Sequence, residues 1–161
     1  MGKKLSERGS PRGLLRWLVR LPIWLYRLRL GFLMGARFIL LEHRGRSSGA
    51  RRFTVLEVVH SDAQGLCIAS GWGDRAQWYR NVMKSPEVAV TQGLRRYRTR
   101  IEGLQVEEAT GLLAGYASRN PGAFKALARF MLCEKVQPDA GGAARLARHV
   151  PLMRLPPPSQ D

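Results

Sequence analysis

The residues best suited to chemistry lie in one short stretch, residues 40–58, where four arginines surround a turn. Arg44, Arg46, Arg51 and Arg52 stand beside two glycines and two serines, between apolar runs that are typical of strands. Guanidinium groups, serine hydroxyls and the backbone N–H groups of a glycine-rich turn can together hold a phosphate. The stretch is therefore either a solvated hairpin tip or an anion-binding cradle.

A second stretch, "ASGWGDRAQWYRN", follows about twenty residues later and has a different character. Its small residues Ala69, Ser70, Gly71 and Gly73 would let a flat ring approach the backbone closely. A helix that begins after Asp74 would add the positive end of its dipole. The two stretches together suit a phosphorylated aromatic cofactor.

Other kinds of site find no support. The chain has no GxSxG, HExxH, P-loop or dinucleotide-binding glycine motif, and no Ser, His and Asp arrangement follows from spacing. Its histidines, His43, His60 and His149, are isolated, and Cys67 and Cys133 lie far apart. We therefore expect no metal site and no disulfide, and a reduced, cytoplasmic setting fits best.

The charge is the unusual feature of the composition. The 161 residues are enough for one domain with a real core, and they include 27 Lys and Arg against 12 Asp and Glu, a net charge of +15. Such a field attracts nucleic acid, anionic lipid or a charged cofactor. Charge alone does not choose among these, so a membrane-binding or nucleic-acid-binding module without enzymatic activity stays an alternative.

Residues 1–36 form a basic, apolar segment that precedes the predicted domain. At 100° per residue, Arg12, Arg16, Arg20 and Arg27 fall within one narrow arc, which predicts an amphipathic helix. Arginines interrupt every apolar run before it reaches the length of a membrane span. The helix could dock on the domain's own sheet or lie peripherally on an anionic membrane, at the inner face of the cell membrane.

Hydrophobic periodicity and turn residues predict the remaining elements. A helix fits residues 74–84, with capping-box spacing from Asp74 to Gln77, and "QPDAGG" at 137–142 is predicted to be a loop. Further helices are expected around 109–116 and from Asn120 onward. The strand-like runs are residues 37–43, 52–60, 66–70, 87–92, 95–103 and 150–155.

The run at 95–103 has two distinct faces. Arg96, Arg98 and Arg100 alternate with Tyr97, Thr99 and Ile101. The cationic face is either a solvated edge strand or the wall of an anion groove.

The order of elements predicts a mainly β, α+β fold. Six or so antiparallel strands with one crossing helix suit a small barrel with helices packed outside it better than a parallel sheet. This barrel domain would span residues 37–155, and residues 156–161 would be a disordered tail.

Three motifs carry a family resemblance, in order and in register over roughly residues 40–90. "GRSSGARRFTVLEV", "ASGWG" and "WYRNVMKSPEVAV" resemble the motifs of the deazaflavin-dependent nitroreductase family. The resemblance implies a split β-barrel of the flavin-reductase-like kind. It also implies binding of the 8-hydroxy-5-deazaflavin coenzyme (F420), with hydride transfer to a small organic acceptor such as a quinone, nitro compound or enone.

The resemblance assigns roles by position. The acceptor's oxygen would be oriented by Ser70, the predicted catalytic residue. The cofactor's phosphate and glutamate tail would lie on Arg46, Ser47, Ser48 and Arg52, and its ring on Thr54, Val55 and Leu56. The redox end would lie at Ala69, Ser70 and Gly71, with the pocket completed by Trp78, Tyr79 and Asn81.

The chain departs from the family pattern at two positions. The usual basic residue after GR is Ser47, and the usual lysine after AS is Gly71. FMN on the same fold is therefore the alternative cofactor. Arg44, Arg51 or the arginine face of residues 95–103 could compensate for the missing cations. Among partners, we expect a small-molecule acceptor and no specific nucleic acid, and a homodimer is compatible with the sequence.

Overall fold

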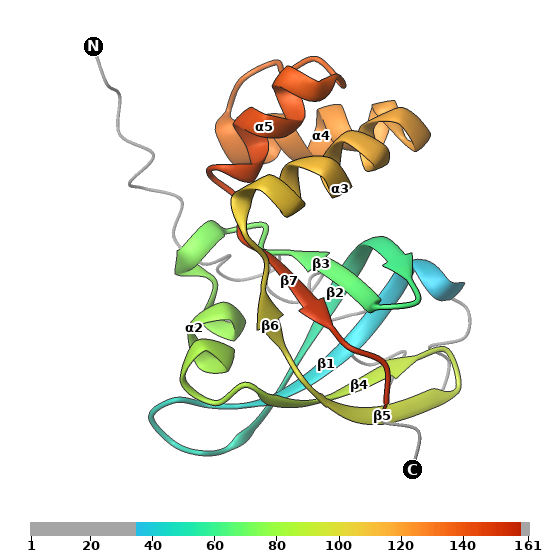
Figure 1. The fold of residues 1–161 in the computed structure, drawn as a ribbon. Coiled ribbons are helices and arrows are strands. Elements are labelled where there is room, and N and C mark those ends of the chain that lie inside the picture. Colours follow the sequence, from blue (N-terminus) through green and yellow to red (C-terminus); the bar gives the residue numbers. More distant parts are fainter. Residues whose placement is uncertain (1–34, 159–161) are drawn as a thin grey trace.

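Seven antiparallel strands form a nearly closed barrel in the computed structural model, which describes residues 35–158 (Figure 1). The strand order is β5-β4-β1-β2-β3-β7-β6. The α+β split-barrel prediction is confirmed. The strands are β1 (Phe38–Arg44), β2 (Arg51–Asp62), β3 (Gly65–Ala69), β4 (Glu87–Gln92), β5 (Arg95–Arg100), β6 (Glu102–Gly103) and β7 (Leu152–Leu155).

The barrel closes because one predicted strand is divided in two. β5 and β6 are separated only by Ile101, whose backbone N–H donates to the carbonyl of Pro86. The first half pairs with β4 and the second with β7. The run predicted at 95–103 therefore supplies both edges of the sheet, which raises the strand number from six to seven.

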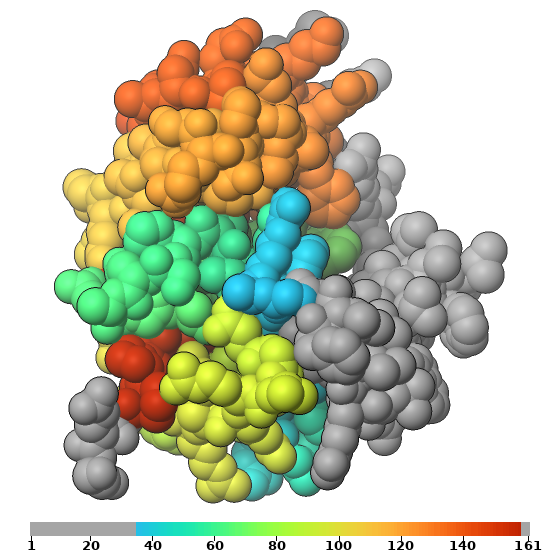
Figure 2. Space-filling view, turned by 90° about the vertical axis from the view of Figure 1, so that its right-hand side faces the viewer, coloured from blue at the N-terminus to red at the C-terminus, as the bar shows by residue number. Residues whose placement is uncertain are grey.

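In the described part of the chain, four α-helices accompany the strands. Three of them, α3, α4 and α5, gather at one end of the barrel, while α2 lies against its side (Figure 1). Figure 2 shows this helical layer, in yellow-orange to red-orange, above the strands. The helices are α2 (Gln77–Lys84), after a short 3₁₀ turn at Gly73–Arg75, α3 (Val106–Arg119), α4 (Pro121–Leu132) and α5 (Ala140–Ala147).

The barrel interior is filled by alternate residues of each strand. Ile39 and Leu41 of β1 point inward together with Val90 of β4, and all three are fully buried. From α2, Trp78 and Val82 join the same cluster. The helix that carries one of the predicted motifs is thus anchored in the barrel core.

A second apolar core fixes the helical layer on the barrel. Leu113, Phe124 and Leu146, one from each of α3, α4 and α5, are fully buried against Val59 of β2 and Leu152 of β7. The predicted helices around 109–116 and from Asn120 onward are both present; the first, α3, is longer than expected, and the second, α4, begins at Pro121. The helices pack outside the barrel, as predicted.

Two local predictions are wrong. The capping box from Asp74 to Gln77 does not form, because α2 begins after Ala76 without a side-chain cap and Asp74 lies in the preceding 3₁₀ turn. The segment predicted as a loop at 137–142 contains the start of α5. There the Asp139 carboxylate accepts a hydrogen bond from the backbone N–H of Gly142, 2.7 Å away.

The predicted amphipathic helix of residues 1–36 lies almost entirely outside the described residues. Within residues 35–158, no helix combines the length and apolar character that a membrane crossing requires. The strands lie between Phe38 and Leu155, inside the predicted 37–155 domain.

Candidate functional site

The arginine-rich stretch forms a tight turn between β1 and β2. The backbone N–H of Gly45 donates to the carbonyl of Ala50 (2.8 Å), and that of Gly49 donates to the carbonyl of Gly45 (2.7 Å). Gly49 has a φ of +66°, a conformation that costs glycine little and other residues more. The side chain of Ser48 accepts a bond from the N–H of Ala50. The turn, residues 45–50, is therefore held by its own backbone.

Three side chains of α2 fix Arg46 from below the turn. Asn81 Oδ1 accepts hydrogen bonds from the backbone N–H and the guanidinium of Arg46, each at 3.1 Å. Gln77 Oε1 accepts a further bond from that guanidinium (2.8 Å), and Lys84 Nζ donates to the carbonyl of Arg46 (2.8 Å). Positions 77, 81 and 84 share one helix face. The turn is thus tied to α2 at one residue.

His43 extends this network into the barrel. Its side chain is buried, with Nδ1 accepting from the Asn81 amide (3.2 Å) and Nε2 facing Thr54 Oγ1 (3.3 Å). Burial, with a smaller contribution from the charge of nearby Arg52, lowers the pKa of His43 to about 4. The imidazole is neutral at pH 7, so it supports Asn81 without adding charge.

The outer side of the turn keeps several donors for a ligand. Ser47, Ser48 and Arg52 are exposed. Within residues 35–158, no partner binds the backbone N–H groups of Ser47 and Ser48, and no carboxylate pairs with Arg52. Guanidinium, hydroxyl and backbone N–H groups of this kind fit a phosphate or carboxylate. The residues present therefore fit the anionic part of the expected cofactor.

The loop after β3 is the other part of the candidate site. Ser70 is fully buried, its backbone N–H donates to the carbonyl of Pro151, and its hydroxyl donates to the carbonyl of Gly73 (2.6 Å). Trp72 follows and meets Phe130 of α4 edge to face, with ring centroids 5.6 Å apart. The two rings remain 43% and 46% exposed. An aromatic pair thus lies beside Gly71, one of the residues predicted at the redox end.

Comparison with known proteins decides the family. The model of the F420H(2)-dependent quinone reductase family matches residues 19–125, which is more than half of the chain. The chain belongs to this family. The expectation of a deazaflavin-dependent oxidoreductase is confirmed, and the family's cofactor is F420 rather than the alternative FMN. A search of curated proteins finds no match.

Solved structures share the fold at low sequence identity. The protein Atu2129 from Agrobacterium tumefaciens, described as of unknown function, aligns with a TM-score of 0.54 and 17% identity over 92% of this chain and 57% of its own. This chain thus spans little more than half of that protein. The heme storage protein HutZ from Vibrio cholerae aligns with a TM-score of 0.53 and 14% identity, over 85% of this chain and 92% of its own. An F420-H2 dependent reductase, FDR-A, gives a TM-score of 0.45 and 20% identity over 74% of this chain and 93% of its own.

The predicted ring-lining residues of this quinone reductase family member lie on two faces of β2. The register pairs Thr54 with Leu41 and Leu56 with Ile39, whose side chains face the barrel interior. Val55 lies between them and faces the other way. A ring that lay against the side chains of Thr54 and Leu56 would meet Val55 only through its backbone.

The tryptophan motif of the family is divided between core and site. Trp78 is 5% exposed and belongs to the barrel core, while Tyr79 is half-buried with its ring at right angles to that of Trp78. Asn81 is buried beneath Arg46. Of these three predicted pocket residues, the structure brings only Asn81 into direct contact with the turn, and there it supports Arg46.

Sequence reasoning missed several residues of the site. In the sequence, His43 is an isolated histidine, and the spacing of Gln77 from Asp74 indicates a capping box instead. The spacing i, i+4, i+7 of residues 77, 81 and 84 was the available signal, because it places polar side chains on one helix face. No sequence signal joined Trp72 to Phe130, since their contact depends on the packing of α4.

The described part of the chain contains no cluster of metal-ligating side chains. No group of three or more His, Cys, Asp or Glu side chains there could hold a metal ion. Cys67 is buried in β3 and Cys133 lies exposed after α4. The donors that do gather are those of the turn.

Proposed function

We propose that this protein uses reduced F420 to reduce a small flat acceptor, with a quinone as the first choice. The observation that carries the proposal is the turn at residues 45–50. There the N–H groups of Ser47 and Ser48, which have no partner among residues 35–158, lie beside hydroxyls and arginines and would form an anion cradle. Membership of the F420H(2)-dependent quinone reductase family supports both the cofactor and the acceptor. The nitro compounds and enones expected from the resemblance stay alternatives.

The cradle is organised before a ligand arrives. Asn81 and Gln77 hold the guanidinium of Arg46 through bonds of 3.1 and 2.8 Å, so little side-chain entropy remains to be lost on binding. Ser47 and Ser48 present their N–H groups from the same turn, and Arg52 stands at its base. We assign the cofactor's phosphate and glutamate tail to these four residues, as the resemblance implies.

Hydride transfer from the cofactor to the acceptor requires few reactive side chains from the protein. When bound, reduced F420 supplies a hydride that, with one proton, converts the quinone to a quinol while the deazaflavin is oxidised. The chain must bind and align the acceptor and exclude water. We propose Ser70 as the residue that orients the acceptor's oxygen. To do so, its hydroxyl would give up its hydrogen bond to the carbonyl of Gly73 and donate to the acceptor instead.

Trp72 and Phe130 support a flat acceptor. Large apolar side chains gain free energy when they leave water, and aromatic rings pair favourably with flat rings. These two rings are half-exposed next to Gly71, where a Cβ atom would lie only 3.8 Å from the ring of Phe130. We propose that the acceptor covers this pair.

The remaining sequence predictions continue as proposals. The arginine pattern of residues 1–36 supports peripheral contact with an anionic membrane from the cytoplasmic side, and we also propose a homodimer. Co-sedimentation with anionic vesicles, compared for the full chain and a variant that lacks residues 1–34, would test the first. The sedimentation coefficient of the full chain would test the second.

Equilibrium binding tests the proposed function directly. F420 is titrated by fluorescence at low and moderate salt, with FMN alongside, and oxidation of reduced F420 is then followed with quinone, nitro and enone acceptors. We expect micromolar binding of F420 that persists in salt and weakens about tenfold in Arg52→Ala. Arg148→Ala, an exposed arginine after α5, is the matched control. Failure to bind F420 would overturn the proposal.

A further inference from the structure

The hairpin of β4 and β5 presents an apolar side chain at its tip. Gln92 and Arg95 form the last pair of the β4–β5 ladder, and they are joined by Gly93, which has a φ of +57°, and Leu94. These four residues are the hairpin tip. Leu94 is 84% exposed, and no other large apolar residue within residues 35–158 is as exposed. A single exposed leucine is ordinary on a protein surface, so its surroundings decide whether it has a role.

The strand that follows the tip is strongly cationic. Four of the six residues of β5 are arginines, and none is acidic. Arg96 and Arg100 pair with carboxylates at 2.7 and 2.8 Å, whereas no carboxylate among residues 35–158 pairs with Arg95 or Arg98. The hairpin therefore carries positive charge that its own neighbours do not neutralise.

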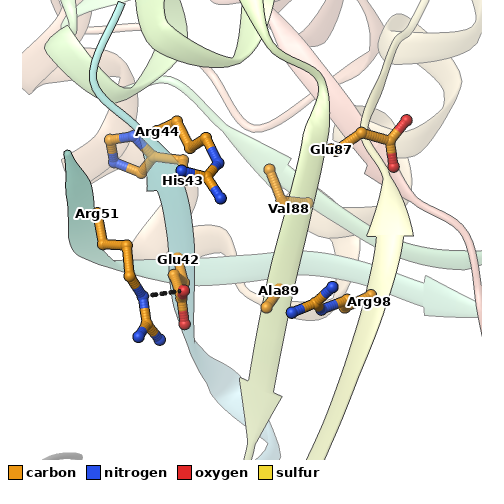
Figure 3. A pocket seen from close by; sticks show the side chains of 8 residues that line it. All are labelled: Glu42, His43, Arg44, Arg51, Glu87, Val88, Ala89 and Arg98. Atoms are coloured by element: carbon orange, nitrogen blue, oxygen red, sulfur yellow. Dashed lines mark hydrogen bonds and ion pairs between the residues drawn. The ribbon is translucent and has the colours of Figure 1, made fainter. Parts of the chain in front are cut away.

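The two arginines without such a carboxylate lie in different surroundings. Arg98 lines a pocket of about 420 Å³ next to the turn, and Figure 3 shows it across from the paired side chains of Glu42 and Arg51. Arg98 thus belongs to the surroundings of the candidate site. Arg95 directly follows Leu94 at the other end of the strand. The hairpin tip therefore combines one exposed apolar side chain with one available guanidinium.

The chain enters the barrel beside the hairpin tip. Gln92 Nε2 donates to the carbonyl of Ala36, 2.7 Å away and two residues before β1 begins. Figure 2 faces this end of the barrel and shows the start of β1, in blue, above the hairpin, in yellow-green. Because a chain spans at most about 3.6 Å per residue, residues 1–34 must join the barrel close to the tip.

The sequence of residues 1–34 has the same chemistry as the tip. Glu7 is the one acidic residue there, against eight lysines and arginines, and the apolar residues include Trp17 and Trp24. Arginine mixed with leucine and tryptophan is the composition that binds the headgroup region of an anionic membrane. A segment and a hairpin that meet at one place can contact the same membrane together.

The hairpin tip and the candidate site lie at opposite ends of the strands. β1 runs from Phe38, at the end of the barrel that holds the tip, to Arg44, at the turn of residues 45–50 (Figure 1). Contact between the tip and a flat surface would leave this turn, and α2 beneath it, open to water. A water-soluble cofactor could then bind while the protein lies on the membrane.

We propose that the hairpin tip contacts an anionic lipid surface, with Leu94 in the headgroup region and Arg95 facing the lipid phosphates. The inference rests on the peripheral membrane contact proposed above for residues 1–36, and it adds a contact made by the folded barrel. Two contacts at one end of the barrel fix the orientation of the protein, which a single chain segment does not. The inference does not depend on F420 binding at the turn.

An environment-sensitive dye at position 94 tests this contact. Leu94→Cys carries the dye in a full-length Cys133→Ser background, where the remaining cysteine, Cys67, is buried. We expect its emission to shift to the blue with vesicles that contain about one third phosphatidylglycerol, and not with phosphatidylcholine alone. Met83→Cys in the same background is the matched control, because Met83 is 61% exposed on α2, at the other end of the barrel. Its dye should not respond.

Co-sedimentation with the same vesicles supplies the second arm. The affinity of the full chain should fall about fivefold in Leu94→Ser and about fivefold in Arg95→Gln, because one loses apolar burial and the other a phosphate contact. Met83→Ser and Arg148→Gln, which change exposed residues away from the tip, should stay within twofold. The F420 affinity of Leu94→Ser and Arg95→Gln, measured without vesicles, should also stay within twofold. Circular dichroism checks that each variant is folded.

An unshifted dye at position 94, with vesicle binding of the full chain intact, would overturn the inference and leave the membrane contact to residues 1–34. Emission that is already blue-shifted without vesicles, and that returns to the red when residues 1–34 are deleted, would mean that this segment covers the tip. An equal shift with a DNA duplex in place of vesicles would assign the tip to nucleic acid. Either result would overturn the inference, as would a full chain that binds no vesicles. Failure to bind F420 alone would overturn the proposed function and not this inference.

Discussion

The amide oxygen of Asn81 binds Arg46 twice, through the backbone N–H and through the guanidinium, at 3.1 Å in each case. The same amide donates to the buried imidazole of His43. One side chain therefore sets both the backbone of the turn and the direction of its arginine. This links the core of the barrel to the cradle, and it makes Asn81 a positioning residue for the anion site.

Replacement of Asn81 by alanine should weaken F420 binding about tenfold, because Arg46 and its N–H lose their common acceptor. The change also leaves His43 without one of its partners, so the free energy of unfolding should fall by about 1 to 3 kcal/mol. Fluorescence titration and urea denaturation measure the two effects. Gln77→Ala, which removes one exposed contact to the same guanidinium, should cost less in both.

An unchanged F420 affinity in Asn81→Ala, with the expected loss of stability, would show that the turn holds its shape without α2. The cradle would then depend on its backbone bonds alone.

The buried imidazole of His43 predicts an acid-sensitive fold. Its pKa is about 4 in the folded chain, against about 6.5 in an unfolded one, so below pH 6.5 the unfolded chain takes up the proton first. Stability should be complete above pH 6.5 and decline by up to about 3 kcal/mol as the pH falls toward 4. Urea denaturation between pH 4 and 8 measures this.

His43→Gln separates this effect from the titration of carboxylates. Glutamine offers an acceptor and a donor but no titration in this range. The variant should show a shallower dependence of stability on pH than the parent between pH 4 and 6.5. Parallel curves would exclude His43 as the source.

The sequence predicted the turn at residues 45–50 better than it predicted the side chains that support it. Residues 45–50 could be identified because arginine, serine and glycine are local signals for an anion-binding turn. Their support by Gln77, Asn81 and Lys84 requires α2 to lie under the turn, and that placement depends on Trp78 and Val82 in the barrel core. Packing between segments that are distant in the sequence cannot be predicted from the residues of any one of them.

In the sheet, too, local features were predicted and features that depend on distant contacts were not. Alternating residues predicted strands at 87–92 and 95–103, and they did so with nearly correct bounds. The interruption at Ile101 escaped prediction, because it arises from the closure of the barrel, where the chain leaves β4 for β7. Alternation also implied that Val55 and its neighbours Thr54 and Leu56 occupy opposite faces, although all three were assigned to one ring.

Phe130 should affect the binding of the acceptor and not the binding of the cofactor. In Phe130→Ala, the KM for a quinone should rise about fivefold to tenfold, because Trp72 loses its ring partner and the acceptor loses an aromatic contact. The Kd for F420 should stay within twofold. Leu94→Ala provides the control, since Leu94 is an exposed apolar residue of the β4–β5 turn. A quinone KM that is unaffected by Phe130→Ala would place the acceptor elsewhere.

The loop predicted at residues 137–142 overlaps the first turn of α5, which contains Gly141 and Gly142, two residues that disfavour helices. The structure compensates with the cap from Asp139 and with close packing. A Cβ atom on Gly142 would lie 2.0 Å from the carbonyl oxygen of Gln137, so only glycine fits there. Gly141 is exposed, and a Cβ atom on it would meet only the carboxylate of Asp139 at an ordinary 3.5 Å.

The two adjacent glycines therefore predict opposite effects of the same substitution. Gly142→Ala should lower the free energy of unfolding by about 2 to 4 kcal/mol, because the backbone at Gln137 must move. Gly141→Ala should raise it by up to about 1 kcal/mol, since alanine favours the helix and restricts the unfolded chain. Urea denaturation of both variants measures the contrast. Equal effects would mean that α5 does not pack against Gln137 as described, and the helical layer around Leu146 would need another arrangement.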